Sequence, residues 1–244
     1  MNTSMNIAII GYGKMGKSIE KEALKLNHQI IARIDDHNFS PNDLMAADVA
    51  IEFSQPAVAV DNIKKCFEAN LPVVVGTTGW YDQYKEVCKI ANDTNQTLFT
   101  ATNYSIGVNL LFHLNLQFAQ LMNNFPQYDI HMNETHHLEK IDHPSGTAST
   151  LAQDIIKSVD RKTNYIGLLE NEQKRLSNSD LSISCKREDN VPGFHKVSYT
   201  SNIDEISISH NAKNRNGFSQ GAIMAAEWVK DKKGIFTMND LLKF

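Results

Sequence analysis

The sequence is poor in cysteine, with three in 244 residues, and these stand far apart as Cys66, Cys88 and Cys185. An odd number of separated cysteines argues against the disulfide framework of a small secreted domain. The first residues, MNTSMNIAIIGYG, lack the charged start and long apolar core of a signal peptide. We therefore expect a cytoplasmic protein in a reducing environment.

The sequence also lacks a long apolar run and a strong excess of charge. Its longest apolar region, residues 106–122, is interrupted by Asn109, His113, Asn115, Gln117 and Gln120, which is typical of an amphipathic or buried helix rather than a membrane span. The net charge of −4 gives no reason to expect nucleic acid or an anionic membrane as a partner. No internal repeat or low-complexity segment is present. The length suits one large or two small globular domains.

A glycine-rich segment follows the first predicted strand. Residues 6–10 (NIAII) are apolar and lead into Gly11-Tyr12-Gly13-Lys14-Met15-Gly16, after which we predict a helix at 17–26. The first glycine permits a tight turn, the second lets backbone approach a pyrophosphate, and the third lets helix pack on strand. Such a motif alone can be a turn without a ligand, but the strand–glycine–helix context favours dinucleotide binding.

Alternating strands and helices continue to residue 104. We predict strands at 29–34, 48–53, 71–75 and 97–100, with helices at 57–70 and 81–92, which indicates a doubly wound parallel sheet of the Rossmann type. Ligands of such sheets bind beyond the carboxyl ends of the strands. The polar segments at those ends, which we expect to bind the cofactor together with residues 11–16, are Asp35 and Asp36, then Gly76, Thr77 and Thr78, then Ala101, Thr102, Asn103 and Tyr104.

The pattern changes after a long predicted helix at 106–123. Residues 181–187, 194–200 and 203–210 alternate apolar and polar side chains, which predicts an antiparallel or mixed sheet with one buried face. We therefore expect an α+β domain at 105–214. The dinucleotide-binding domain then spans 1–104 and is completed by helices within 215–244, at about 217–230 and 237–242.

Residues 128–151 concentrate the candidate chemistry of this second domain. A predicted strand is followed by His136, His137 and Lys140 in a polar loop, and then by Pro144-Ser145-Gly146-Thr147, which predicts a helix start near Ala148. Cations together with helix N-terminal N–H groups favour a small anion, most simply a carboxylate.

A metal site is the alternative for this segment. Its ligand-type residues are Glu134, His136, His137, Asp142 and His143. Adjacent histidines on an extended segment point to opposite faces, and the helical HExxH spacing is absent. We therefore expect no metal.

Taken in order, these motifs resemble the 4-hydroxy-tetrahydrodipicolinate (dihydrodipicolinate) reductase family. The resemblance rests most on the run E-x-H-H-x-x-K-x-D-x-P-S-G-T-A at 134–148, with support from the glycine loop, 76–79, 103–105 and the tail at 210–222. It implies NADH- or NADPH-dependent reduction of a cyclic dicarboxylate in lysine and diaminopimelate biosynthesis. It also implies a homotetramer assembled through the substrate-domain sheets, and hinge closure between domains.

The resemblance also assigns roles to residues. It implies that His136 and Lys140 form the catalytic pair and that His137, Gly146 and Thr147 bind substrate, with cofactor at residues 11–16, Asp35, 76–78 and 101–104. The Ser145–Thr147 backbone suits a substrate carboxylate. His136, or a water that it positions, suits protonation of the reduced ring. Many relatives carry one more residue in the glycine loop and a basic residue in place of Asp36.

Two other functions remain open from the residues alone. A dinucleotide sensor with a partner-binding domain explains the first hundred residues but not the His/Lys cluster, and the chain has no basic recognition helix. A dehydrogenase of similar two-domain build, of the aspartate or homoserine type, is the alternative among enzymes. Asp35 and Asp36, placed near the adenosine ribose, favour NADH or comparable use of both cofactors, because carboxylates repel a 2′-phosphate.

Overall fold

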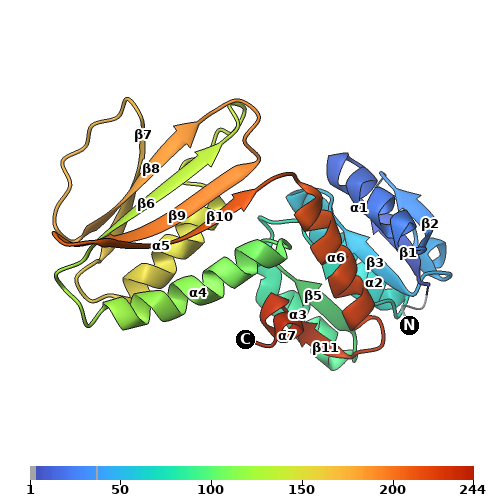
Figure 1. Cartoon of the computed structure of the whole chain (residues 1–244). Coiled ribbons are helices and arrows are strands. Elements are labelled where there is room, and N and C mark those ends of the chain that lie inside the picture. Colours follow the sequence, from blue (N-terminus) through green and yellow to red (C-terminus); the bar gives the residue numbers. More distant parts are fainter. Residues whose placement is uncertain (1–3, 37) are drawn as a thin grey trace. The chain divides into compact units, whose positions relative to one another are not determined.

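The structure, a computed structural model, describes residues 4–36 and 38–244 and divides into two compact units (Figure 1). The first unit comprises Met1–Ser105 together with Asn216–Phe244, and the second comprises Ile106–Arg215. Within the described residues, no helix combines the length and apolar character that crossing a membrane requires.

The first unit is built on a six-stranded parallel sheet, as the sequence predicted. Its strand order is β11-β5-β4-β3-β1-β2. The strands are β1 (Asn6–Ile10), β2 (Gln29–Ile34), β3 (Val49–Glu52), β4 (Val73–Val75), β5 (Thr97–Thr100) and β11 (Gly234–Phe236). β11 was not predicted; it has three residues, too few to show a period, and pairs in parallel with β5.

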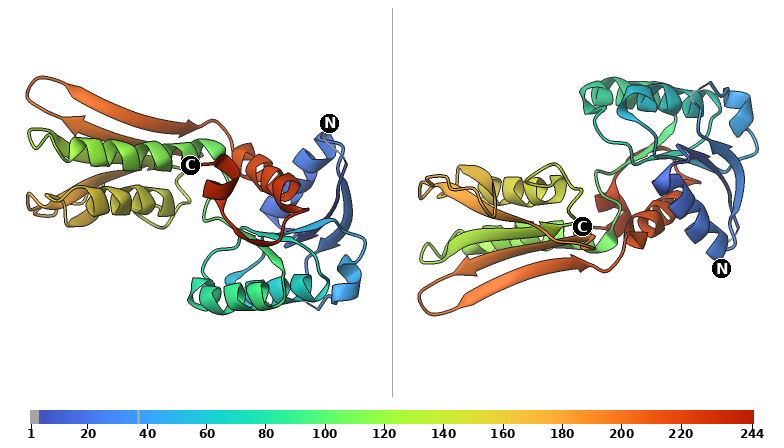
Figure 2. Two further views of the ribbon diagram at one scale, coloured as in Figure 1. Left: turned by 90° about the horizontal axis from the view of Figure 1, so that it is seen from below. Right: turned by 90° about the horizontal axis from the view of Figure 1, so that it is seen from above.

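Helices cover both faces of this sheet (Figure 2). They are α1 (Lys14–Lys25), α2 (Pro56–Glu68), α3 (Tyr84–Asp93), α6 (Asn216–Val229) and α7 (Met238–Leu242), with short 3₁₀ turns η1 (Pro41–Leu44) and η2 (Tyr81–Gln83). Ile7 and Ile9 pack with α1 and α6, whereas Ala8 and Ile10 pack with α2. Both faces of β1 are therefore buried, which is why its sequence is apolar throughout.

One helix boundary differs from the prediction in a way that concerns the glycine loop. Gly13 is the N-cap of α1, so the helix begins at Lys14 rather than at residue 17. Lys14, Met15 and Gly16 are therefore the first helical turn and not part of a loop. The free N–H groups at the helix start therefore follow Gly13 directly.

The second unit contains a mixed sheet, one of the two kinds predicted, and its five strands lie in the order β10-β9-β6-β8-β7. The strands are β6 (Asp129–His136), β7 (Asn164–Leu169), β8 (Asp180–Arg187), β9 (Gly193–Thr200) and β10 (Glu205–Ala212). β6 pairs in parallel with β8 and antiparallel with β9. Helices α4 (Ile106–Met122) and α5 (Gly146–Ser158) pack on one face through Leu111, Leu151 and Ile155.

Two features of this unit differ from the sequence analysis. β7 was not predicted, because its half-buried residues show no alternation. His136 was expected in a polar loop but is the last residue of β6 and is buried. The strand continues one residue further than its apolar alternation suggested, because His136 itself occupies an inward-facing position.

Candidate active site

The three glycines of residues 11–16, two in the turn between β1 and α1 and one in the first turn of α1, meet different constraints. Gly11 has φ +91°, and a Cβ there would lie 2.1 Å from the Phe53 carbonyl oxygen. A Cβ on Gly16 would lie 2.3 Å from the Gly11 carbonyl oxygen. By contrast, a Cβ on Gly13 would meet no atom within 4 Å among the described residues. The protein's own packing requires glycine at 11 and 16, while position 13 leaves room for a bound group.

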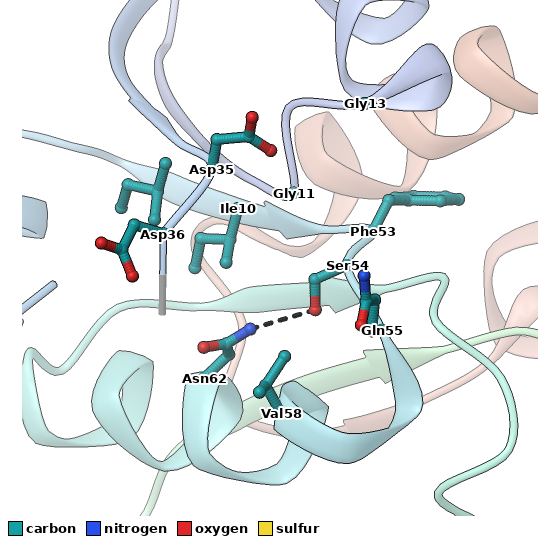
Figure 3. Close-up of a pocket in the computed structure, with 11 residues that line it drawn as sticks. Ile10, Gly11, Gly13, Asp35, Asp36, Phe53, Ser54, Gln55, Val58 and Asn62 are labelled. Atoms are coloured by element: carbon teal, nitrogen blue, oxygen red, sulfur yellow. Dashed lines mark hydrogen bonds between the residues drawn. The ribbon is translucent and has the colours of Figure 1, made fainter. Parts of the chain in front are cut away.

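A cavity of about 360 Å³ adjoins this loop at the carboxyl ends of the strands (Figure 3). Its lining residues are Ile10, Gly11, Gly13, Ile34, Asp35, Asp36, Phe53, Ser54, Gln55, Val58 and Asn62. Asp35 lies beside the loop and accepts a hydrogen bond from the Tyr12 N–H at 3.3 Å. Asp36 accepts the Asn38 N–H at 3.0 Å. The fold thus brings Gly11, Gly13 and both acids to one cavity, whose lining does not include Tyr12, Lys14, Met15 or Gly16.

The predicted cofactor residues that follow β4 and β5 also do not line this cavity. They are Gly76, Thr77, Thr78, Ala101, Thr102, Asn103 and Tyr104. Thr77 accepts the Ser54 N–H at 2.8 Å, and Tyr104 donates its hydroxyl to the Val75 carbonyl at 2.7 Å. Tyr104 is buried in the core, so its side chain supports β4 instead of facing a ligand.

A carboxylate beneath the cavity was not singled out from the sequence. Glu52 ends β3 and is fully buried, and burial raises its pKa. It accepts hydrogen bonds from the Ser54 N–H at 3.2 Å and the Asn62 side chain at 3.3 Å. Both partners line the cavity, so Glu52 fixes the cavity wall. The available signal was a single acid within the otherwise apolar segment VAIEF.

The second unit places a buried carboxylate, Glu134, beside the predicted catalytic histidine. The Glu134 side chain has no exposed surface, and its Oε2 lies 3.6 Å from His136 Nδ1. On the neighbouring strands, Arg187 lies 3.6 Å from Oε1, and His195 Nε2 lies 3.8 Å from Oε2. Strand register creates this group, because β6 pairs Glu134 with His195 and His136 with Arg187.

Ser145 connects this group to the start of α5. Its N–H faces both Glu134 oxygens, at 3.2 and 3.1 Å. Its hydroxyl accepts the Ala148 N–H at 3.2 Å and lies 3.1 Å from His195 Nε2. Ser145 is thus the N-cap of α5, which begins at Gly146 rather than near Ala148 as predicted, and helix N-terminal N–H groups follow it. A Cβ on Gly146, the first helical residue, would meet no described atom within 4 Å.

Lys140 lies in the segment between β6 and α5. Its ammonium contacts both oxygens of Asp142, at 2.7 and 2.9 Å. Arg187 anchors the same segment by donating to the carbonyls of Lys140 at 3.1 Å and Asp142 at 2.8 Å. The sequence analysis missed this use of Arg187, which is 47 residues from Lys140.

Burial dominates the electrostatics of the histidines. It lowers the pKa of His136 to about 4, with Glu134 opposing the shift and Lys140, Arg187 and His137 adding to it. It lowers the pKa of His195 to about 3. Both rings are therefore neutral near pH 7 in the absence of a ligand, and a bound dianion would favour their protonation.

His137 points elsewhere, as expected for adjacent residues leaving a strand. It lines a cavity of about 370 Å³ together with Leu138, Glu139, Asp189, Asn190, Val191, Pro192 and Arg215. Arg215 is a further cation that the sequence analysis placed only in the family-like tail. Thr147 is half-buried in the first turn of α5, next to Gly146.

Glu134, His136 and His195 are also the residue types of a metal site, with ligand atoms within 4.8 Å of one another. Arg187 stands beside the same carboxylate, and the Ser145 N–H already faces both of its oxygens. A divalent cation would compete with these groups. The absence of a metal stays a prediction.

The sequence matches known proteins over nearly its whole length. Residues 5–104 match the family model described as dihydrodipicolinate reductase, N-terminus, and residues 107–242 match dihydrodipicolinate reductase, C-terminus. A curated 4-hydroxy-tetrahydrodipicolinate reductase from Christiangramia forsetii is 44% identical over 98% of both chains. The chain belongs to the dihydrodipicolinate reductase family. A reductase of that name from Buchnera aphidicola is 33% identical, over 99% of this chain and 88% of its own.

Solved structures agree with this membership at the level of the fold. A dipicolinate-bound dihydrodipicolinate reductase from a Paenisporosarcina species superposes with a TM-score of 0.74 at 22% identity, covering 96% of this chain and 98% of its own. An amine dehydrogenase from Mycobacterium smegmatis reaches 0.56 at 9% identity over 96% of this chain and 94% of its own. The two-unit architecture thus extends beyond the dihydrodipicolinate reductase family.

Proposed function

We propose that this protein reduces 4-hydroxy-tetrahydrodipicolinate to tetrahydrodipicolinate with a nicotinamide dinucleotide, in the pathway to diaminopimelate and lysine. The observation that carries the proposal is the 44% identity over 98% of the chain to a curated reductase of that name. The cluster around His136 supports it, because this cluster offers the cations and N–H groups that a dicarboxylate requires.

The first unit suits the dinucleotide. The open space at Gly13 and the N-terminus of α1 would receive the pyrophosphate, and Asp35 and Asp36 would face the adenosine ribose. The dihydronicotinamide supplies a hydride to the substrate ring. Residues 76–78 and 101–104 stay proposed cofactor contacts, through backbone where the side chains are engaged as in Tyr104.

The second unit suits the dicarboxylate. The N-terminus of α5, at Ser145, Gly146 and Thr147, would bind one carboxylate through backbone N–H groups. Lys140 would exchange Asp142 for the substrate, and His137 would contribute from the adjoining cavity. His136, or a water that it holds, would protonate the ring atom on which negative charge develops.

The direct test supplies enzymatically generated substrate and follows the loss of dihydronicotinamide absorbance with NADH and with NADPH. The expected result is substrate-dependent oxidation, with NADH preferred or used comparably. Oxidation only with another substrate, such as the imine formed from oxaloacetate and ammonia, would favour an aspartate-type dehydrogenase. A purely sensing protein would bind NADH without turnover.

Cofactor preference follows from the charges in the first unit. Asp35 and Asp36 both line the cavity, and Arg33 is bound to Glu20, with Nε to Oε1 at 2.8 Å. The guanidinium that could attract a 2′-phosphate is therefore engaged elsewhere. A hundredfold preference for NADPH would contradict this placement. A homotetramer and a cytoplasmic location complete the proposal, and light scattering of the purified protein tests the former.

A further inference from the structure

Glu134 is a carboxylate with no exposed surface, and this needs a physical explanation. Burying a charge costs several kcal/mol unless partners compensate it. The compensating groups are the Ser145 N–H, at 3.2 and 3.1 Å, and Arg187 at 3.6 Å. The carboxylate is thus fixed by a helix start on one side and by a neighbouring strand on the other.

We propose that Glu134 is the positioning residue of the active site, which orients the imidazole of His136 and sets its proton affinity in opposition to Arg187. This inference rests on the proposed reductase function. Glu134 acts through His136 and itself touches neither substrate nor cofactor.

The orientation of the ring follows from its two nitrogens. Nδ1 is buried, makes no hydrogen bond within the described residues and lies 3.6 Å from Glu134 Oε2, so the negative charge of the carboxylate favours a proton on Nδ1. Nε2 faces the opposite way, toward Gly193, where a Cβ would lie 3.3 Å from it. His195 fixes the ring plane from the side, with ring centroids 5.0 Å apart at 68°. The nitrogen left for substrate or water is therefore Nε2.

Each charged group on the elements around His136 either favours or disfavours protonation of its ring. Glu134, on the same strand, favours the protonated ring. Arg187 on β8, together with Lys140 and His137 in the following segment, disfavours it. His195 on β9 is neutral near pH 7, because burial lowers its pKa to about 3. Glu134 and Arg187 therefore act on the same ring with opposite effects, although they bind each other.

The opposite effects of Glu134 and Arg187 on His136 can be tested, because a purely structural role of Glu134 would not shift the pH–rate profile. In Glu134→Gln, the loss of the negative charge should shift the His136-dependent limb of the pH–rate profile to lower pH by about one unit. In Arg187→Gln, the loss of the positive charge should shift it to higher pH by a similar amount. Turnover should fall at least tenfold in Glu134→Gln, with a smaller change in KM.

Three variants complete the design. His136→Gln should abolish the limb, which identifies it. Glu134→Asp keeps the negative charge, so its pH–rate limb should lie at the same pH as in the wild type, although its turnover should be slower. Glu170→Gln is the matched control, because Glu170 is exposed and lies 3.9 Å from Lys186 outside this group, and it should leave the profile unchanged.

The outcomes separate the inference from the function on which it rests. A wild-type protein without reductase activity would refute the proposed function. An active wild type whose Glu134→Gln and Arg187→Gln variants shift the limb in the same direction, or not at all, would overturn the role of Glu134. Should Glu134→Gln fail to fold in a thermal melt, the upward shift of Arg187→Gln and the unshifted Glu134→Asp decide in its place.

Discussion

Two histidines of the second unit, His136 and His195, are buried in their neutral form. His136 and His195 have pKa values of about 4 and about 3, whereas an unfolded histidine titrates near 6.5. The folded chain therefore binds fewer protons than the unfolded chain between these values. Stability should be full above pH 6.5 and should be lost as the pH falls toward 4.

The first prediction concerns this acid sensitivity. Because only the unfolded chain protonates His195 in this range, this residue alone should lower the free energy of unfolding by roughly 2 kcal/mol between pH 7 and pH 5. The melting temperature of His195→Gln should therefore decline less over that range than that of the wild type. Calorimetry at several pH values measures this, with His113→Gln on α4 as the control. Parallel declines in wild type and His195→Gln would show that His195 is not kept neutral by the fold.

The second prediction concerns Lys140, whose ammonium forms an ion pair with Asp142 in a solvent-accessible segment. Lys140→Ala should reduce turnover more than a hundredfold, on the order of 3 kcal/mol, because a charge-assisted contact that orients the substrate is lost. NADH affinity should stay unchanged. Steady-state kinetics and NADH fluorescence titration measure the two, and Lys157→Ala at the far end of α5 is the control. Near-normal turnover would remove Lys140 from the site.

The residues that sequence reasoning could find are those adjacent in the chain. His136, Lys140 and Ser145 fall within ten positions and carry recognisable chemistry. Arg187 and His195 join them only through the pairing of β6 with β8 and β9. Strand register is not encoded in local pattern, so neither residue could be assigned from the sequence.

Among the elements, the start of α5 is the proposed binding site for a substrate carboxylate. Position 146 is a helical glycine without a packing reason, since a Cβ there meets open space. Alanine favours a helix by up to about 1 kcal/mol relative to glycine. Stability does not explain this glycine, whereas the proposed approach of a carboxylate to the backbone N–H groups would.

The third prediction follows from this position. Gly146→Ala should melt at the same or a higher temperature than the wild type, while its affinity for 2,6-pyridinedicarboxylate falls at least tenfold, because the methyl group blocks approach to the helix start. Titration calorimetry and thermal melts measure the two effects. Lys157→Ala, at the far end of α5, should change neither. Undiminished binding by Gly146→Ala would place the dicarboxylate elsewhere.

Helices and strands with a clear pattern of apolar residues could be predicted from the sequence, and those without such a pattern could not. The strands β1 to β5 of the first sheet and the long helix α4 were predicted within two residues, because apolar runs and amphipathic spacing mark them. β7 and β11 were missed, because a half-buried edge strand and a three-residue strand carry no period. The start of α1 was misplaced, because a glycine cap resembles a loop.

At the scale of the whole molecule, the second unit is inserted into the first. The chain leaves the first unit after Ser105 and returns at Asn216. Ala222, Ala225, Ala226 and Val229 of the returning α6 are fully buried against the parallel sheet. One face of the parallel sheet is therefore covered only in part, by α1, until the last segment has returned.

The fourth prediction tests this dependence. Residues 106–215 alone should unfold cooperatively, because they contain their own core. Residues 1–105 alone should be aggregated or molten, whereas the same residues joined to 216–244 by a short flexible linker should fold. Circular dichroism and urea titration measure this. A cooperatively folded 1–105 fragment would show that α6 is dispensable for the first sheet.

The insertion has a consequence for synthesis on the ribosome. At about 5 to 20 residues per second, the inserted unit takes roughly 5 to 20 seconds to translate. Throughout that interval the face of the first sheet that α6 will cover stays open, and we expect nascent chains stalled before residue 216 to be protease-sensitive in 1–105 but not in the inserted unit. The part of the chain made first would then be the last to become native, and it would depend on chaperones for longest.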